Sequence, residues 1–168
     1  MADYIKLKPF ILKWEGGYVN DPLDRGGATN KGVTLATFKQ VYGSNKTAED
    51  LKQMTEAQWN HIFKKFYWDR WRADEINSQS VANIVVDWVW ASGIHGIKRV
   101  QRLLGVVADG IVGTKTLTAL NSQDAKTLFN RIKEDRIVFV NNIVLANPPQ
   151  KRFLKGWLNR INSIKFEE

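Results

Sequence analysis

The feature that most constrains the fold is a helical apolar pattern that stops at a pair of glycines. Apolar side chains recur at helical spacing before the glycines, at Ile5, Leu7, Phe10, Ile11 and Trp14. Gly16 and Gly17 follow at once, and glycine ends helices because it adopts backbone conformations that other residues avoid. The pattern therefore predicts a helix whose last turn contains Glu15.

Glu15 would lie in an unusual place for a carboxylate. The exposed carbonyl groups at the end of a helix form the negative end of its dipole, which opposes ionisation of a carboxyl group there. Burial against Trp14 or Tyr18 would act in the same direction. A carboxyl group that keeps its proton near neutral pH can act as a general acid, so Glu15 is the first candidate catalytic residue.

The segment that follows, residues 20–32, is too rich in Gly, Pro, Asn and Asp to be helical. We expect residues 18–20 and 31–34 to flank it as a short β-hairpin. Asp24 lies nine residues after Glu15, and an exposed aspartate in a turn should stay ionised. A protonated carboxyl group that faces an ionised one across a cleft is the arrangement that hydrolyses a glycosidic bond.

Asp24 has a catalytic and a structural interpretation. As a catalytic group it would activate water or stabilise positive charge at the sugar, and Thr29 would hold the water. An aspartate in such a segment can instead simply cap a turn. An isolated glutamate near a helix end is, in the same way, mostly a solvated surface group. If both carboxylates act, a separation of ~6.5–9.5 Å would indicate inversion at the sugar and ~5–5.5 Å retention.

A longer motif surrounds the two carboxylates. It comprises Glu15-Gly16-Gly17-Tyr18, Asp21-Pro22, Asp24, Gly26-Gly27, Thr29-Asn30-Lys31-Gly32 and Thr34. The motif closely resembles the signature of family 108 glycoside hydrolases, and this many matches at the same spacing favour the catalytic interpretation. The resemblance implies an N-acetylmuramidase (lysozyme) with Glu15 as catalytic residue. Such an enzyme hydrolyses β-1,4 bonds between N-acetylmuramic acid and N-acetylglucosamine in bacterial peptidoglycan.

The order of the Glu, Asp and Thr residues is also similar to that of phage-type lysozymes of a different family. In those enzymes the Thr falls six residues after the Asp. Thr29 falls five residues after Asp24, whereas Asn30 falls six after it, so either residue can orient water. Tyr18 and Asn30 are the candidate substrate-binding residues of this motif.

The next predicted helices carry an aromatic stripe. Thr34 is expected to cap a helix that ends before Gly43, and residues 55–58 form a capping box for another. Aromatic residues follow the box at helical spacing. We assign three of them to the core, Trp59, Phe63 and Phe66, and keep three as surfaces on which sugar could stack, Tyr67, Trp68 and Trp71. The run Tyr67-Trp68-Asp69 resembles the Tyr-Trp-Asp element of the same family.

A central helix is predicted over residues 81–92, begun by Ser80 and ended by Gly93, and it is apolar nearly all round. Asp87 lies inside it, and a buried carboxylate must be paired or hydrogen-bonded. Asp87 therefore either braces the fold, which is the commoner role of a buried charge, or faces the cleft as a substrate-binding residue. Asp87 with Ser92-Gly93 resembles an Asp-x-Ala-Val-Asn-Ser-Gly element of the family, with Ala91 where Asn is usual.

A second module begins near residue 94. Helices are predicted over residues 97–104, 115–120 and 124–145, with Ser122 as a cap, and a last amphipathic helix follows. The Asp109-Gly110-x-x-Gly113-x-x-Thr116 pattern, with Gly156-Trp157-Leu158-Asn159-Arg160, resembles the helical peptidoglycan-binding module that usually follows this catalytic domain. We therefore expect a mostly α-helical, lysozyme-like fold with one small β-hairpin. Residues 1–93 would form the catalytic domain, and residues 94–168 would form the binding module packed on it.

Positive charge is concentrated in the second module. Residues 94–168 hold 13 Lys and Arg against 6 Asp and Glu, whereas residues 1–93 hold 12 against 11. A basic surface favours polyanions such as nucleic acid, anionic lipid or the anionic polymers of a bacterial envelope. A basic nucleic-acid binder would not explain why the densest motif lies in the nearly neutral part. We therefore expect peptidoglycan glycan strands as the partner, anionic envelope polymers beside them, and no specific nucleic acid.

Composition argues against several other classes of protein. The absence of cysteine and the separation of His61 from His95 predict no metal and no cofactor. The apolar runs are too short to span a membrane, and the N-terminus lacks the apolar region of a signal peptide. We expect a monomer made in the cytoplasm and released to the cell wall, as a phage endolysin is through a membrane hole or as a wall hydrolase is by a dedicated route. The alternatives are a non-catalytic peptidoglycan-binding protein and a lytic transglycosylase.

Overall fold

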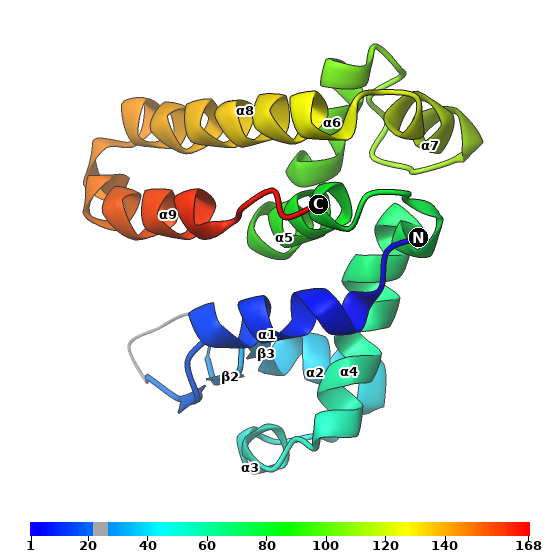
Figure 1. Cartoon of the computed structure of the whole chain (residues 1–168). Helices are drawn as coiled ribbons and strands as arrows, with labels where there is room; N and C mark the ends of the chain where they lie inside the picture. The colour runs from blue at the N-terminus through cyan, green and yellow to red at the C-terminus, as the bar shows by residue number, and fades with distance from the viewer. Residues whose placement is uncertain (22–26) are drawn as a thin grey trace. The chain divides into compact units, whose positions relative to one another are not determined.

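The computed structural model of the protein describes residues 1–21 and 27–168. It is mostly α-helical with one small β-sheet, which confirms the expected fold class (Figure 1). The chain forms two compact units, one of Ile5–Phe66 and one of Met1–Tyr4 with Tyr67–Glu168. Each unit is described by itself below.

The smaller unit holds short helices and the sheet. Its elements are most of α1 (Tyr4–Trp14), β1 (Tyr18–Val19), β2 (Thr29–Asn30), β3 (Val33–Thr34), α2 (Leu35–Tyr42), α3 (Ala48–Lys52) and α4 (Glu56–Phe63). Thr34 caps α2 and accepts from the Thr37 amide, and Thr55 and Gln58 form the predicted capping box of α4. The helix α3 was not predicted, although its capping box of Thr47 and Asp50 is visible in the sequence.

The expected β-hairpin is a three-stranded antiparallel sheet, which corrects the prediction. The central strand β2 pairs with β1 through Tyr18 and Asn30, and with β3 through Thr29 and Thr34. Residues 31–34 were expected to form one strand, but Lys31 and Gly32 both have positive φ angles, 49° and 82°. Two successive positive φ angles make the tight turn that joins antiparallel strands, so the chain reverses inside this run.

The larger unit is built from helices. After a π-helical segment that crosses the border between the units, η1 (Lys64–Trp68), it contains η2 (Asp69–Trp71), η3 (Ala73–Glu75), α5 (Gln79–Ser92), α6 (His95–Leu104), α7 (Thr114–Asn121), α8 (Ala125–Ala146), η4 (Pro148–Gln150) and α9 (Lys151–Ser163). α5 packs against both α6 and α8, and α8 packs against α9 (Figure 1). Nearly every residue of α5 from Ser80 to Val89 is buried, so α5 is the centre of this unit.

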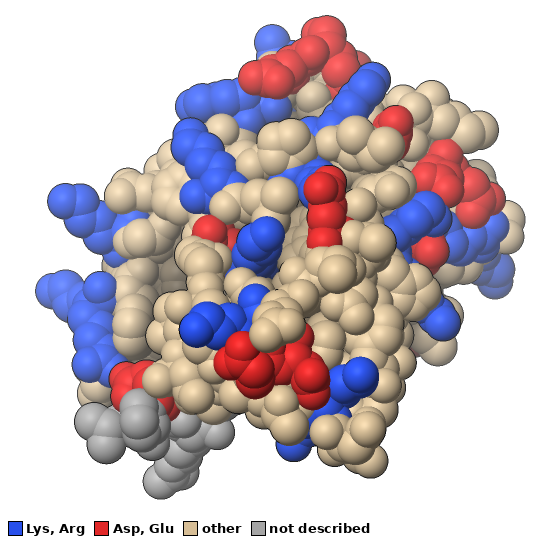
Figure 2. All heavy atoms as spheres, turned by 90° about the horizontal axis from the view of Figure 1, so that it is seen from below, with Lys and Arg blue, Asp and Glu red and all other residues tan. Residues whose placement is uncertain are grey.

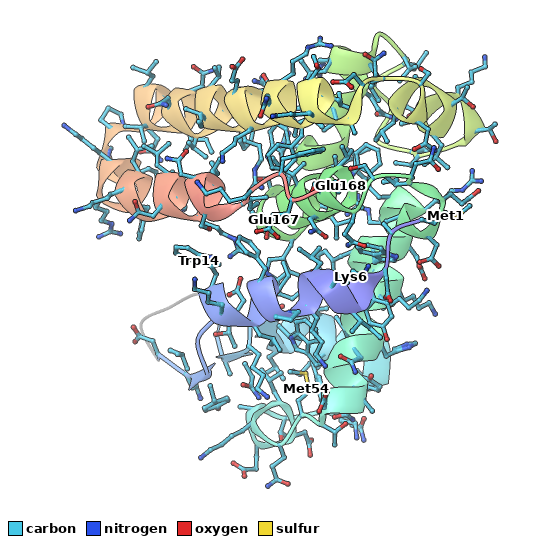
Figure 3. All side chains as sticks on the ribbon, in the orientation of Figure 1. Met1, Lys6, Trp14, Met54, Glu167 and Glu168 are labelled. Atoms are coloured by element: carbon cyan, nitrogen blue, oxygen red, sulfur yellow. The ribbon has the colours of Figure 1, made fainter. Side chains whose placement is uncertain are left out.

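Two predicted helix starts in the larger unit were wrong by two residues. Ser78, not Ser80, caps α5 by accepting from the Val81 amide, and Asp124, not Ser122, caps α8 by accepting from the Thr127 amide. In each case the extended backbone that a cap requires occurs at the observed residue. The carboxylate of Glu168, labelled in Figure 3, also accepts from the Gln79 and Ser80 amides, so it joins the Ser78 hydroxyl in satisfying the start of α5.

α5 and α6 approach each other closely at Gly96. A Cβ atom at Gly96 would lie 2.7 Å from the backbone carbon of Trp88 and 2.8 Å from the backbone nitrogen of Val89. Those atoms belong to helix backbone and cannot rotate away. Gly96 is therefore required for the spacing between the two helices.

We expect Gly96→Ala to lower the free energy of unfolding by about 1–3 kcal/mol, because the added methyl group must push α6 away from α5. The matched control is Gly156→Ala in α9, where an added Cβ meets no atom within 4 Å. This control should keep or raise stability, by up to about 1 kcal/mol, since alanine favours helix. Urea denaturation followed by circular dichroism measures both, and equal midpoints would contradict the close packing.

Candidate active site

Glu15 directly follows the last residue of α1, which ends at Trp14 (Figure 3). Its backbone N–H donates to the Ile11 carbonyl at 3.0 Å, so helical hydrogen bonding reaches as far as Glu15. The Glu15 side chain is half-buried, while Gly16 and Gly17 are exposed. The sequence therefore placed Glu15 correctly at the end of this helix, and its catalytic role stays a prediction.

A cavity of about 200 Å³ lies beside α1 in the same unit, lined by Lys8, Leu12, Lys31, Glu56 and Trp59. Lys8 and Leu12 precede Glu15 by seven and three residues, so all three share one face of the helix. The cavity was not predicted from the sequence, although the helical spacing of Lys8, Leu12 and Glu15 was visible there.

Polar contacts order the walls of this cavity. Lys8 Nζ donates to Glu56 at 2.7 Å, and Trp59 Nε1 donates to the Lys31 carbonyl at 3.0 Å. The hydrogen bond and the charge of Lys8 hold the pKa of the Glu56 carboxyl below its usual value, so the Glu56 carboxylate is ionised near neutral pH. Trp59 is only 2% exposed, as expected for a core residue, yet it forms part of the cavity wall.

The structure separates the roles of Thr29 and Asn30. Asn30 is 5% exposed, and its Nδ2 donates to the carbonyls of Leu51 at 2.9 Å and Lys52 at 3.3 Å. Asn30 thus ties the sheet to α3, and its predicted role in substrate binding is corrected to a structural one because its amide hydrogens are already used. Thr29 points to the other face of the sheet, since neighbouring residues of a strand alternate, and it is half-exposed.

Tyr18 pairs with Asn30 and so shares its face of the sheet. The Tyr18 ring is half-buried, and Lys52 Nζ lies 5.6 Å from its centroid. One face of the ring is therefore close to a cation, and a contact with substrate stays a prediction. Asp24 lies outside the described residues.

Two of the three proposed stacking residues are core residues. Trp68 and Trp71 are both 0% exposed, and Trp68 Nε1 donates to Asp74 at 2.8 Å. Their predicted contact with sugar is wrong because the chain continues from α4 as a π-helical and then a 3₁₀ segment, and this change of period turns both indoles inward. Tyr67 is half-buried, with its ring 4.6 Å from that of Trp90, and its role stays a prediction.

Asp87 belongs to a buried ion cluster in the larger unit. It is 0% exposed and accepts from Arg136 Nη1 at 2.9 Å and from Arg160 Nη2 at 2.7 Å. Both carboxylate oxygens are used, so Asp87 braces α5 against α8 and α9. Its alternative role as a substrate-binding residue is wrong, because the carboxylate is enclosed by these partners.

Among residues 1–21 and 27–168, no three His, Asp or Glu side chains lie close enough together to hold a metal ion. Within the same ranges, no helix combines the length and apolar character that crossing a membrane needs.

Comparisons with known proteins match both halves of the chain. The family described as glycosyl hydrolase 108 matches residues 8–93, and the family described as predicted peptidoglycan domain matches residues 95–162. The solved structure of SagA from Brucella abortus is similar, with a TM-score of 0.82 and 30% sequence identity over 96% of this chain and 90% of that one. The comparison with curated proteins found no match.

We expect Asn30→Asp to lower the free energy of unfolding by about 1–3 kcal/mol, because it replaces a donor by an acceptor that faces two carbonyl oxygens. The neighbouring change Thr29→Val keeps the side-chain shape at a half-exposed position and should alter stability by less than about 0.5 kcal/mol. Thermal unfolding of the two variants measures this difference. If both melt alike, Asn30 does not brace the sheet.

Proposed function

The chain belongs to the glycosyl hydrolase 108 family, and from this premise we propose that it is an N-acetylmuramidase, a lysozyme. As a member of that family with a predicted peptidoglycan domain, it is a glycoside hydrolase that acts on peptidoglycan. The proposal adds the bond: the β-1,4 linkage between N-acetylmuramic acid and N-acetylglucosamine. Its main support is the half-buried carboxyl group of Glu15, which lies at the end of α1 inside the matched region.

In the proposed mechanism Glu15 is the general acid. Its proton passes to the glycosidic oxygen as the bond from that oxygen to the anomeric carbon breaks, and positive charge develops on the sugar that is left behind. Proton transfer by a positioned side chain of this kind contributes about 10²–10⁴-fold to a rate.

The second carboxylate of the proposal is Asp24. An ionised Asp24 would either remove a proton from the attacking water or stabilise the positive charge on the sugar. Thr29 is proposed to orient that water, because its side chain lies on the face of the sheet opposite to Asn30 and is not enclosed. The reaction needs no group besides these side chains and water.

The second half of the chain is proposed to keep the enzyme on its substrate. Binding of the wall by one part raises the local concentration of glycan at the other, which increases the rate at low enzyme concentration. Basic and acidic side chains are interspersed on the face that Figure 2 shows. The excess of positive charge lies in residues 94–168, with 13 Lys and Arg against 6 Asp and Glu, and it supports contact with anionic polymers of the envelope.

The setting of the enzyme is part of the proposal. An endolysin that a phage releases from the host cytoplasm, or a wall hydrolase with a dedicated export route, would both deliver a monomeric muramidase to the cell wall. In either setting the substrate is the intact sacculus. Purified sacculi are therefore the substrate on which the function should be tested.

We expect Glu15→Gln to lower the rate of sacculus solubilisation by about 10²–10⁴-fold, because glutamine keeps the shape of the side chain but has no proton to transfer. The matched control is Glu49→Gln, which removes an exposed carboxylate from α3 of the same unit and should leave the rate unchanged. The change in turbidity of purified sacculi measures the rate, and circular dichroism confirms the fold of both variants.

The products of the same reaction decide between the proposal and its alternatives. A muramidase releases fragments that end in reducing N-acetylmuramic acid, whereas a lytic transglycosylase leaves an anhydro sugar, and mass spectrometry distinguishes the two. Sacculi that bind the protein but release no fragments would point to a non-catalytic binder. Full turnover by the Glu15→Gln variant would exclude Glu15 as the acid.

We expect Asp24→Asn to lower the same rate by about 10²-fold or more, since asparagine can neither accept the proton of water nor stabilise positive charge. The nearby change Asp21→Asn is the comparison, and it should retain turnover. The opposite result, with turnover lost only at Asp21, would assign the second carboxylate to Asp21.

A further inference from the structure

A second cavity lies within the larger unit, between α5, α8 and α9. Its volume is about 130 Å³, and it is lined by Trp88, Ala91, Ser92, Arg136, Val140, Ile143, Trp157, Arg160 and Ile161. All of these residues belong to one compact unit. The proposed catalytic mechanism assigns this cavity no role.

The polar part of the cavity wall comes from two arginines of the ion cluster. Arg136 and Arg160 both line the cavity, and both donate to the single carboxylate of Asp87. Arg136 is only 3% exposed, and its Nε is buried without a hydrogen-bond partner among the described residues. A guanidinium presents five N–H donors, so Arg136 has donor capacity that the Asp87 contact does not use.

Burial makes this unused capacity costly. Loss of water around Arg136 holds the pKa of its guanidinium below the usual value, although Asp87 opposes this change. A buried donor of a charged group without an acceptor costs more than a neutral one, because the charge has lost its hydration. A negatively charged acceptor that entered the cavity would satisfy Arg136, and a carboxylate matches the planar fork of a guanidinium.

The remaining walls define the rest of the ligand. Trp88, Trp157 and the aliphatic residues make most of the lining apolar. The volume is well below the ~300–1,000 Å³ of pockets that enclose a whole drug-sized ligand. It therefore accepts one end of a larger molecule, a carboxylate with a small apolar group beside it, and not a sugar ring.

We propose that this cavity binds the terminal carboxylate of a peptidoglycan stem peptide, with the methyl group of the last alanine against Trp88 and Trp157. This inference rests on peptidoglycan as the substrate of the proposed function. Stem peptides are short, branch from the muramic acid units of the glycan, and present alanine and free carboxylates. A binding site for the peptide would hold the strand through a part of the substrate that the glycosidase reaction leaves intact.

The test is binding of N-acetylmuramyl-tetrapeptide to the whole chain, measured by isothermal titration calorimetry. This compound has no bond between two sugars, so its binding does not depend on turnover. Ala91→Leu should weaken binding at least tenfold, because the larger side chain at this exposed position of the wall fills the cavity. The matched control is Ala146→Leu at the exposed end of α8, which should bind as the wild type does.

Two further measurements test the chemistry. Arg136→Lys keeps a positive charge beside Asp87 but removes the Nε–H and the fork, so it should also weaken binding at least tenfold. The same tetrapeptide with its carboxyl groups amidated should bind the wild type at least tenfold more weakly. Equal binding by Ala91→Leu and Ala146→Leu, or equal binding of the amidated peptide, would overturn the proposal.

Glycerol phosphate serves as a competitor in the same titration. If it binds the cavity more tightly than the tetrapeptide does, the ligand of the cavity is an anionic envelope polymer and the peptide proposal is wrong. The outcomes also separate this inference from the proposed function. If the tetrapeptide fails to bind while Glu15→Gln abolishes solubilisation of sacculi, only the peptide site is wrong. If the tetrapeptide binds but wild-type protein releases no fragments, the muramidase proposal is wrong and the peptide site is not.

Discussion

The buried contact of Asp87 with Arg136 and Arg160 is the interaction on which the larger unit depends. It joins α5 to α8 and α9, whose arginines lie 49 and 73 residues further along the chain. Removing one partner from a buried ion pair costs about 3–5 kcal/mol, because the other charge is then left without compensation. α5 lies in the region matched by the hydrolase family, and α8 and α9 lie in the peptidoglycan-domain match. Within the larger unit, this contact therefore joins one helix of the first matched region to two helices of the second.

That arrangement explains why the borders of the family matches and of the compact units differ. The matches meet between residues 93 and 95, whereas the compact units divide at Phe66 and Tyr67. α5 supplies the apolar surface that both α6 and α8 cover, so it packs with the second half of the chain although it belongs to the first match. The smaller unit keeps Glu15, Thr29 and the cavity beside α1.

Within the smaller unit, backbone constraints position the candidate catalytic groups. Glu15 is placed by the end of α1, and Thr29 by a strand that is paired on both sides. Asn30 then links this strand to α3 through two hydrogen bonds to carbonyl groups. A carboxyl group and a hydroxyl group that rigid elements hold lose little conformational freedom when substrate binds. This loss is small because the two groups are already positioned for proton transfer before the reaction.

The sequence by itself determined the features that depend on local physical chemistry. Helical spacing and the glycine pair predicted that a helix ends at Glu15, the Thr55 box predicted the start of α4, and the apolar run around Asp87 predicted a buried helix. Only the tertiary structure decided which side chains are enclosed. Trp68 and Trp71 turned out to be core, Asn30 a brace and Asp87 an ion-cluster residue. The partners of Asn30 and Asp87 lie 21 to 73 residues away, and spacing carries no information about them. The cavity beside Arg136 also could not be predicted from the sequence, because its walls come from three helices that meet only after the chain has folded.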